Sequence, residues 1–263
     1  MAGKGQLIVI GCGIQLGRHI SERGVSEIDR ADTVLVLADP FAFDWIAERR
    51  PDAINLTEDY DDRIDRRVTY RRMVERIVTP VLAGRRVCAV FYGHPGVFAQ
   101  VPHAAIEQVR SAGLPARMEP GISAEACLYA DLGLDPGERG VQSIEATRFL
   151  AYRHDLDPTA LVLLWQVALA GNLACVGFEP DPKRLQLLVD KLSGWYALYT
   201  PVILYEAAQL PIEDFRAEQM ALADLPTARY KEYTTLVIPP AHEAERDEHW
   251  IEALEALEST STS

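Results

Sequence analysis

The alternation of short apolar runs with helix-like stretches is the feature that most limits how this chain can fold. Six runs rich in Val, Ile, Leu or aromatic residues are predicted strands: residues 7–10, 33–37, 86–92, 161–168, 202–205 and 233–238. The stretches between them predict helices: residues 17–23, 41–49, 62–82, 102–111, 123–132, 183–192 and 213–225. Such alternation is typical of an α/β protein with mostly parallel strands. The first half fits repeated βα units, and the second half favours a mixed sheet.

The interruption Glu119-Pro120-Gly121 is the expected boundary between two domains. A chain of 263 residues has room for two, at roughly 100–200 residues each. We therefore expect an α/β domain over residues 1–119, an α/β domain with a mixed sheet over 120–240, and an acidic tail with a short amphipathic helix over 241–263. The apolar face of that helix could pack on the body or on a partner, and packing on the body is favoured; its residues are Trp250, Ile251, Leu254 and Leu257.

Charge and hydropathy exclude several classes of protein. The net charge of −13 repels phosphate backbones, so we expect no nucleic-acid partner. No apolar run approaches the roughly 18 residues that a membrane-spanning helix needs. The first residues lack a signal-peptide cleavage site, so we expect a cytoplasmic protein that does not bind membranes. The four cysteines are far apart and form no CxxC pair, which indicates buried thiols and no metal site; they are Cys12, Cys88, Cys127 and Cys175.

Glycine-rich loops follow two of the predicted elements. The first strand ends in GCGIQLG, but Leu16 stands where a dinucleotide fingerprint needs its third glycine, so a structural turn is favoured over nicotinamide binding. The third strand enters GHPGVF at 93–98, at the edge where open α/β sheets bind ligands. The loop PGISAE at 120–125 opens the second domain, with Ser123 placed to cap a helix. Two such loops at a domain boundary indicate a ligand site there.

An arginine-rich stretch at residues 59–73 is a predicted helix entered through acidic residues. Arg66 and Tyr70 are four residues apart and share one helical face, and Tyr60 lies before them near the helix start. Six arginines lie between Arg63 and Arg76. On composition alone, such a stretch is favoured as a solvated charged face.

Several of these motifs together resemble the tetrapyrrole methylase-like, or class III, S-adenosylmethionine methyltransferases. The matching pieces are the opening GCG turn, GHPGVF, PGISAE and the strand at 161–166. Within that superfamily the chain is more similar to borosin-type peptide backbone α-N-methyltransferases, in CAVFYGHPGVF (88–98), PGISAE, YADLG (129–133) and TTLVIPP (234–240). The resemblance implies two α/β domains with S-adenosylmethionine folded in the cleft between them.

The resemblance also implies which residues contact S-adenosylmethionine and its product, S-adenosylhomocysteine. Gln166 offers an amide that can both donate to and accept from a base edge. His94 is explained equally well as a turn residue beside proline. The implied cofactor-binding residues are Tyr92, His94, Val97, Phe98, Ser123, Ala124, Gln166, Tyr205, Thr234 and Thr235.

Tyr60, Arg66 and Tyr70 fall where borosin methyltransferases keep their catalytic tyrosine–arginine–tyrosine set, and Thr57 stands where some relatives carry a further tyrosine. A peptide nitrogen is a poor nucleophile because its lone pair is delocalised into the carbonyl. Methylation therefore requires removal of the amide proton. An ionised tyrosine can take this proton if a cation such as Arg66 stabilises the negative charge. Tyr70 is our first choice as the base, and Tyr92 could orient the amide or the methyl group.

The resemblance implies an enzyme that N-methylates backbone amides of a precursor peptide. Fused relatives carry that peptide as a C-terminal extension, whereas this sequence ends in an acidic stretch, so we expect the split form acting on a separate precursor. It also implies a homodimer. Two alternatives stay open. One is a tetrapyrrole C-methyltransferase acting on uroporphyrinogen or a precorrin. The other is a nicotinamide-dependent oxidoreductase or a non-catalytic nucleotide-binding module.

Overall fold

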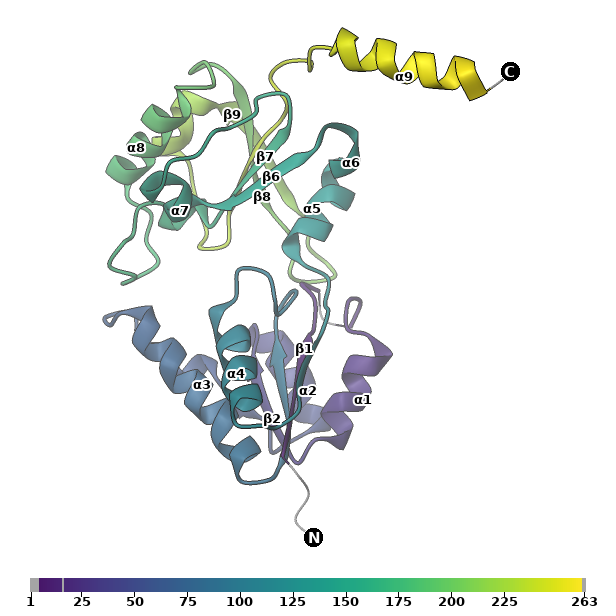
Figure 1. The fold of residues 1–263 in the computed structure, drawn as a ribbon. Helices are drawn as coiled ribbons and strands as arrows, with labels where there is room; N and C mark the ends of the chain where they lie inside the picture. The colour runs from purple at the N-terminus through teal and green to yellow at the C-terminus, as the bar shows by residue number, and fades with distance from the viewer. Residues whose placement is uncertain (1–4, 16, 262–263) are drawn as a thin grey trace.

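Two five-stranded sheets organise the chain (Figure 1). The computed structural model describes residues 5–15 and 17–261, so Leu16 lies outside the described residues. The first sheet is parallel in the order β3-β2-β4-β1-β5; its strands are β1 (Gln6–Gly11), β2 (Thr33–Leu37), β3 (Ile54–Asn55), β4 (Arg86–Phe91) and β5 (Ala116–Glu119). The second is mixed in the order β6-β7-β10-β8-β9; its strands are β6 (Val141–Glu145), β7 (Leu161–Trp165), β8 (Pro201–Glu206), β9 (Arg216–Ala221) and β10 (Thr235–Ile238). The predicted α/β class, with a mixed second sheet, is confirmed.

Helices cover both faces of the first sheet because its strands are apolar on both sides. In β1, Leu7 and Val9 pack towards α3 (Arg66–Leu82) and α4 (Gln100–Ser111). Ile8 and Ile10 point the other way and pack with residues of α1 (Glu22–Arg30) and α2 (Pro40–Arg49). Successive side chains of a strand face opposite sides, so a continuous apolar run builds two core layers at once.

The remaining helical segments lie mainly in the second half of the chain. They are η1 (Thr57–Asp59), α5 (Ala124–Leu132), α6 (Pro136–Arg139), α7 (Ala146–Ala151), η2 (Val167–Leu169), α8 (Pro182–Leu192), η3 (Leu222–Thr227) and α9 (Glu248–Ser261). The Ser123 hydroxyl accepts a hydrogen bond from the Ala126 N–H at 3.1 Å and so caps α5, as predicted. The first sheet ends at Glu119 and the second begins at Val141. The domain boundary at 119/120 remains a prediction.

Three predicted helices differ from the structure. Residues 213–225 contain β9 and η3 because β9 pairs along its whole length with β8, and that pairing outweighs the helix-forming residues of its sequence. The first helix begins at Glu22, where the Ser21 hydroxyl caps it, and not at residue 17. The arginine-rich helix begins at Arg66, because the Asp65 carboxylate accepts from the Arg67 N–H at 2.9 Å.

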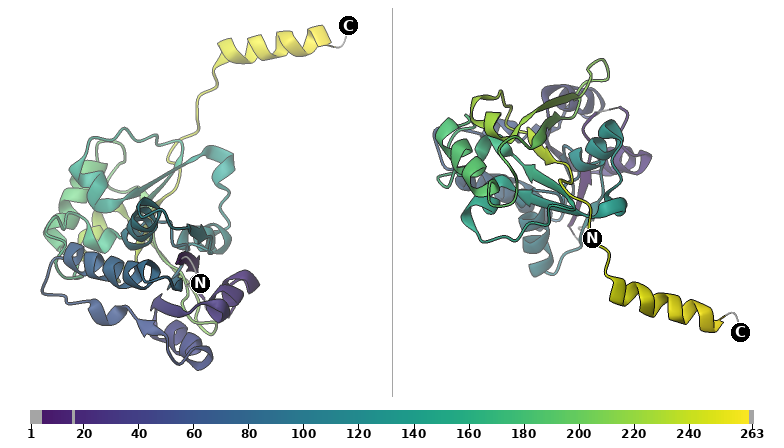
Figure 2. Two further views of the ribbon diagram at one scale, coloured as in Figure 1. Left: turned by 60° about the horizontal axis from the view of Figure 1, so that its bottom comes forward. Right: turned by 90° about the horizontal axis from the view of Figure 1, so that it is seen from above.

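Two expectations about side chains also need correction. Cys12 and Cys88 are buried, but Cys127, in α5, and Cys175, in the loop at 171–180, are only half-buried. The helix α9 stands away from both sheets in every view, so the expected packing of its apolar face on the body is wrong (Figures 1 and 2). Its face stays exposed because the segment that precedes it leads it outwards from the second sheet; Trp250, Leu254 and Leu257 are each at least 60% exposed.

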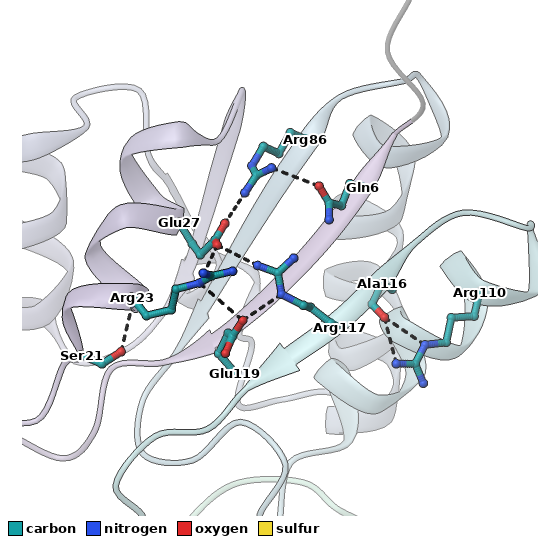
Figure 3. A network of polar contacts seen from close by, with 10 residues as sticks. Gln6, Ser21, Arg23, Glu27, Arg86, Arg110, Ala116, Arg117 and Glu119 are labelled. Atoms are coloured by element: carbon teal, nitrogen blue, oxygen red, sulfur yellow. Dashed lines mark hydrogen bonds and ion pairs between the residues drawn. The ribbon is translucent and has the colours of Figure 1, made fainter.

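A buried carboxylate ties α1 to the first sheet (Figure 3). The Glu27 side chain is 1% exposed and accepts hydrogen bonds from Arg86 and from Arg117, the latter at 2.7 Å. Arg23 lies 3.0 Å from the same carboxylate. Desolvation by itself would raise the pKa of Glu27, but the hydrogen bond from Arg86 and the charges of the three arginines outweigh it, so its pKa lies below the ordinary value.

Replacing Glu27 with glutamine should lower the free energy of unfolding at pH 7 by about 2–3 kcal/mol, because three guanidinium groups lose their shared counter-charge. Since the folded pKa of Glu27 is depressed, its contribution is present above the unfolded value of 4.5 and is lost as pH falls through the folded value. Urea unfolding at pH 7 and at pH 3 tests this, with exposed Glu22→Gln in the same helix as control. A Glu27→Gln effect that matches the control at pH 7 contradicts the prediction.

Candidate active site

A cavity of about 440 Å³ opens at the carboxyl end of β4 and is lined by residues from both halves of the chain. The first half contributes the arginine-rich helix and the loop after β4. The second half contributes the residues after β7. The residues that line the cavity include Leu37, Tyr60, Arg66, Arg67, Tyr70, Tyr92, His94, Val97, Phe98, Glu145, Thr147, Gln166, Asn172 and Cys175. This edge of a parallel sheet is where α/β proteins bind ligands.

Three glycines allow three backbone segments to approach one another closely beside the cavity. A Cβ atom on Gly11 would lie 2.4 Å from the Gly93 carbonyl oxygen and 2.8 Å from the Gly121 Cα. A Cβ on Gly121 would lie 2.3 Å from the same oxygen. The Gly93 N–H also donates to the Gly13 carbonyl at 2.8 Å. The GCG turn, GHPGVF and PGISAE therefore form one close-packed backbone junction that has no room for side chains.

Backbone strain gathers at the same cavity. Among residues 5–15 and 17–261, only three residues other than glycine have a positive φ: Phe98 at 49°, Gln166 at 54° and Cys175 at 54°. All three line the cavity. This conformation costs free energy for a residue with a Cβ, so it persists where the surrounding structure imposes it, and such positions concentrate at functional sites.

Tyr60, Arg66 and Tyr70 meet on one wall of the cavity. The rings of Tyr60 and Tyr70 lie edge to face with centroids 6.4 Å apart. Arg66 is the first residue of α3, so the turn before the helix and the helix itself place these side chains next to one another. The structure thus brings together the three residues that the sequence selected, and Tyr92 lines the same cavity.

The loop at residues 171–180 contacts Arg66 and Tyr60 and fixes their positions in the cavity wall. The Arg66 N–H donates to the Cys175 carbonyl at 3.0 Å, and its Nη1 donates to the Gly177 carbonyl at 2.8 Å. The Arg66 guanidinium also lies 4.7 Å from the centre of the Phe178 ring, a cation–π contact. Phe178 packs against Tyr60 as well, at 6.2 Å between centroids. Phe178 therefore touches two of the three selected residues, although the sequence analysis did not single it out.

Two phenols in the cavity, those of Tyr60 and Tyr92, have raised pKa values. Desolvation by the surrounding protein raises the pKa of Tyr60, as do the neighbouring Tyr70 and Tyr92, and the Arg66 charge partly offsets the increase. The pKa of Tyr92 is also raised, mainly by desolvation. Tyr92 is 57% exposed, and the surface that it exposes includes part of the cavity wall. A base made from these tyrosines would need the cation beside them.

The residues expected to bind a cofactor fall into two groups. Tyr92, His94, Val97, Phe98 and Gln166 line the cavity. The His94 Nδ1 accepts from the Gly96 N–H at 2.9 Å, so His94 also shapes its own turn.

The other five residues do not line the cavity: Ser123, Ala124, Tyr205, Thr234 and Thr235. The buried Tyr205 hydroxyl donates to Asp131 at 2.6 Å, and the Thr234 hydroxyl donates to Glu206 at 2.6 Å. The Thr234 carbonyl accepts from the N–H of Val167, next to Gln166, at 3.1 Å. Thr234 thus lies beside the segment that carries Gln166, and contact of the five residues with a cofactor remains a prediction.

Within the described part of the chain, no group of three or more His, Cys, Asp or Glu residues is arranged to hold a metal ion. A search of the same residues finds no helix with the length and apolar character needed to cross a membrane.

Comparisons with known proteins agree with this architecture. The sequence profile of the family described as Tetrapyrrole (Corrin/Porphyrin) Methylases matches residues 6–226. Among solved structures, the uroporphyrin-III-C-methyltransferase from Thermus thermophilus has a TM-score of 0.65 at 19% identity, covering 90% of this chain and 93% of that one. The cobalt precorrin-4 methyltransferase CbiF has a TM-score of 0.63 at 18% identity, covering 89% and 94%. At this identity the likeness concerns the fold.

Curated relatives are closer in sequence. A methyltransferase/ribosomally synthesized type I borosin cyclic peptide precursor of Coprinopsis marcescibilis is 38% identical over 225 residues, covering 84% of this chain and 57% of that protein. The lentinulin A precursor methyltransferase of Lentinula edodes is 35% identical over 248 residues, covering 92% and 59%. The chain thus spans somewhat more than half the length of these relatives.

Proposed function

Because the chain belongs to the tetrapyrrole (corrin/porphyrin) methylase family, we propose that it is an S-adenosylmethionine-dependent enzyme that methylates backbone amide nitrogens of a peptide. The observation that carries the proposal is the wall formed by Tyr60, Arg66 and Tyr70 at the cavity between the two sheets. The names of the curated relatives, which combine a methyltransferase with a peptide precursor, support a peptide as the acceptor.

The residues of the cavity suit S-adenosylmethionine. The close junction of Gly11, Gly93 and Gly121 fixes the GCG turn, GHPGVF and PGISAE against one another, so the loop residues that line the cavity are held in place before a ligand binds. The Gln166 side chain, held in a left-handed turn, offers an amide to a base edge. The rings of Tyr92 and Phe98 offer aromatic faces to a cation. When bound there, S-adenosylmethionine would supply an electrophilic methyl group.

The chain's own residues prepare the acceptor amide. An ionised tyrosine, Tyr70 by our first choice, takes the amide proton, and the negative charge that develops on the peptide oxygen needs a cationic partner. Arg66 uses Nη1 for the Gly177 carbonyl, and its other guanidinium N–H groups have no hydrogen-bond partner in the described chain. Those N–H groups are available for the peptide oxygen or for a phenolate, while Phe178 and Gly177 fix the guanidinium in place.

Positioning of the reactants in the cavity supplies the rest of the rate increase, since Phe178 packs on Tyr60 and Arg66 and residues of both halves of the chain line the cavity. Tyr92 lines this cavity, which supports a role in orienting the amide or the methyl group.

The alternatives carried from the sequence are less well supported. A tetrapyrrole acceptor is supported by the description of the family profile and by structures under 20% identical, whereas the relatives above 30% identity are named as borosin or cyclic peptide precursors. A nicotinamide enzyme has no support in the family profile. A separate precursor, a homodimer and a cytoplasmic location stay predictions.

The full chain, incubated with S-adenosylmethionine carrying a deuterated methyl group, should add 17-dalton steps to a short peptide of glycine, alanine and valine. Uroporphyrinogen offered under the same conditions should gain no mass. Mass spectrometry reads both acceptors, and calorimetry with S-adenosylhomocysteine and with NAD tests the cofactor. Labelling of uroporphyrinogen and not of the peptide would support the tetrapyrrole C-methyltransferase. Binding of NAD in place of S-adenosylhomocysteine would reject both methyltransferase hypotheses.

A further inference from the structure

A second cavity of about 330 Å³ continues from the first along α3 and α4. The two cavities share four lining residues: Arg67, Tyr70, Gln100 and Val101. Tyr70 therefore stands at the junction between them. A peptide whose amide lies at Tyr70 has neighbouring residues only a few ångströms away, so the second cavity lies on a path that those residues can take.

The shape of this groove suits an extended chain. One wall is formed by Arg67, Arg71 and Glu75 of α3, and the other by Gln100, Ala104 and Gln108 of α4. On each helix these residues recur every four positions, so each wall is about 12 Å long. An extended peptide rises roughly 3.3 Å per residue, and the groove therefore accommodates about three or four residues.

The floor of the groove is apolar and its rim is polar. Val74 and Val101, on the floor, are 4% and 3% exposed. On the rim, the side chains of Arg71, Glu75, Gln100 and Gln108 make no hydrogen bond or ion pair with any residue that the structure describes, although all four are exposed and polar. Glutamine amides can donate to and accept from a peptide backbone.

The arginines of α3 and of the turn before it differ in their pairing. Arg63, Arg67 and Arg76 pair with aspartates at 2.7–2.9 Å, and Arg66 donates to Gly177. Arg71 and Arg72 make no hydrogen bond or ion pair among the described residues, although each has an aspartate, Asp65 and Asp61 respectively, within electrostatic range beyond ion-pair distance. Only Arg71 lines the groove. In a chain of net charge −13, an unpaired guanidinium in a groove beside the active cavity is a specific attraction for an anionic group.

We propose that this groove binds the residues that flank the methylated amide, and that Arg71 recognises a carboxylate within two residues of that amide. This inference rests on the proposed function. Glu75, one helical turn beyond Arg71, disfavours a second carboxylate at the far end of the groove. The groove thus sets which position of the peptide carries the acid, and the protein selects its methylation site partly by charge.

The test uses nine-residue peptides of glycine, alanine and valine in which one glutamate, or one glutamine, is moved through every position. For the full chain, at least one glutamate peptide should show kcat/KM about three to five times that of its glutamine partner, as expected for one partly exposed ion pair. Arg71→Gln should remove this preference. Arg72→Gln is the matched control, since Arg72 is also unpaired and lies outside the groove, and it should retain the preference.

Each peptide is made with a free and with an amidated C-terminus, which separates a side-chain carboxylate from a terminal one. Fluorescence anisotropy of the same labelled peptides, with S-adenosylhomocysteine present, reads binding without methyl transfer. If peptides bind with an Arg71-dependent glutamate preference but none is methylated, the groove stands and the proposed function fails. Three results would overturn the inference. The glutamate preference could be equal in the unmodified chain and in both variants, it could be lost to the same extent in Arg71→Gln and Arg72→Gln, or no peptide could bind.

Discussion

Replacing Arg66 with methionine should lower kcat for peptide methylation by about a thousandfold, because one side chain stabilises both the developing negative charge on the peptide and the ionised tyrosine. Methionine keeps much of the apolar stem and loses the charge, the hydrogen bond to Gly177 and the cation–π contact with Phe178. Arg66→Lys should recover only part of the rate, since an ammonium cannot reproduce the planar fork of a guanidinium.

The pH dependence gives this prediction a second readout. The base must be an ionised phenol, whether Tyr70 or Tyr60 takes the proton, so the rate of the unmodified chain should rise with pH through the alkaline range. The Arg66 charge lowers the pKa of Tyr60 and would stabilise either phenolate, so Arg66→Met should move the rise to higher pH. Arg72→Met, on the exposed side of the same helix, is the control. A rate within tenfold of the unmodified chain, with intact S-adenosylhomocysteine binding, would remove Arg66 from the chemistry.

Replacing Gly121 with alanine should destabilise the fold by more than about 3 kcal/mol, because there is no space for the added atom. Its Cβ would lie 2.3 Å from the Gly93 carbonyl oxygen and 2.8 Å from the Gly11 Cα, and both neighbours are backbone atoms that cannot rotate away. Relief requires the GCG turn, GHPGVF and PGISAE to separate. We therefore expect weaker S-adenosylhomocysteine binding even under conditions where the variant is folded.

Gly194→Ala is the matched control, since the nearest atom to its added Cβ is the Lys191 carbonyl oxygen at 3.4 Å, an ordinary contact. Urea unfolding should place this control within about 1 kcal/mol of the unmodified chain. Calorimetry then compares the binding of S-adenosylhomocysteine by the folded variants. A Gly121→Ala protein with unchanged stability and unchanged binding would show that the close approach of the three glycines is not required.

Local patterns in the sequence were sufficient to predict those parts of the fold that depend on residues close together in the chain. The apolar runs of β1, β2 and β4 are buried on both faces, so their residues alone identify them as strands of a covered parallel sheet. Ser123 caps α5 through a contact only three residues along the chain. Tyr60, Arg66 and Tyr70 are close in sequence, and the turn before α3 keeps them close in space.

The features that sequence reasoning missed depend on distant parts of the chain. The residues of β9 favour a helix, and only the neighbouring β8 makes them a strand. Phe178 contacts Arg66 although the two are 112 residues apart in the sequence, and no local pattern predicts that contact. The left-handed conformations of Phe98, Gln166 and Cys175 are imposed by tertiary structure, since those residue types do not prefer it. The two glycines of the loop at 171–180, Gly171 and Gly177, were the available signal for a tight fold there.

If the cavity prepares a backbone amide nitrogen for methylation, the new methyl group must lie on that nitrogen. A peptide product labelled with the deuterated methyl group is hydrolysed in acid, and its amino acids are separated against N-methyl standards. We expect the label to elute with N-methylglycine, N-methylalanine or N-methylvaline. Two results would contradict methylation of a backbone amide. One is label at the peptide's free α-amino group alone, which tandem mass spectrometry of the intact product would show. The other is a peptide that stays unlabelled while the chain binds S-adenosylmethionine.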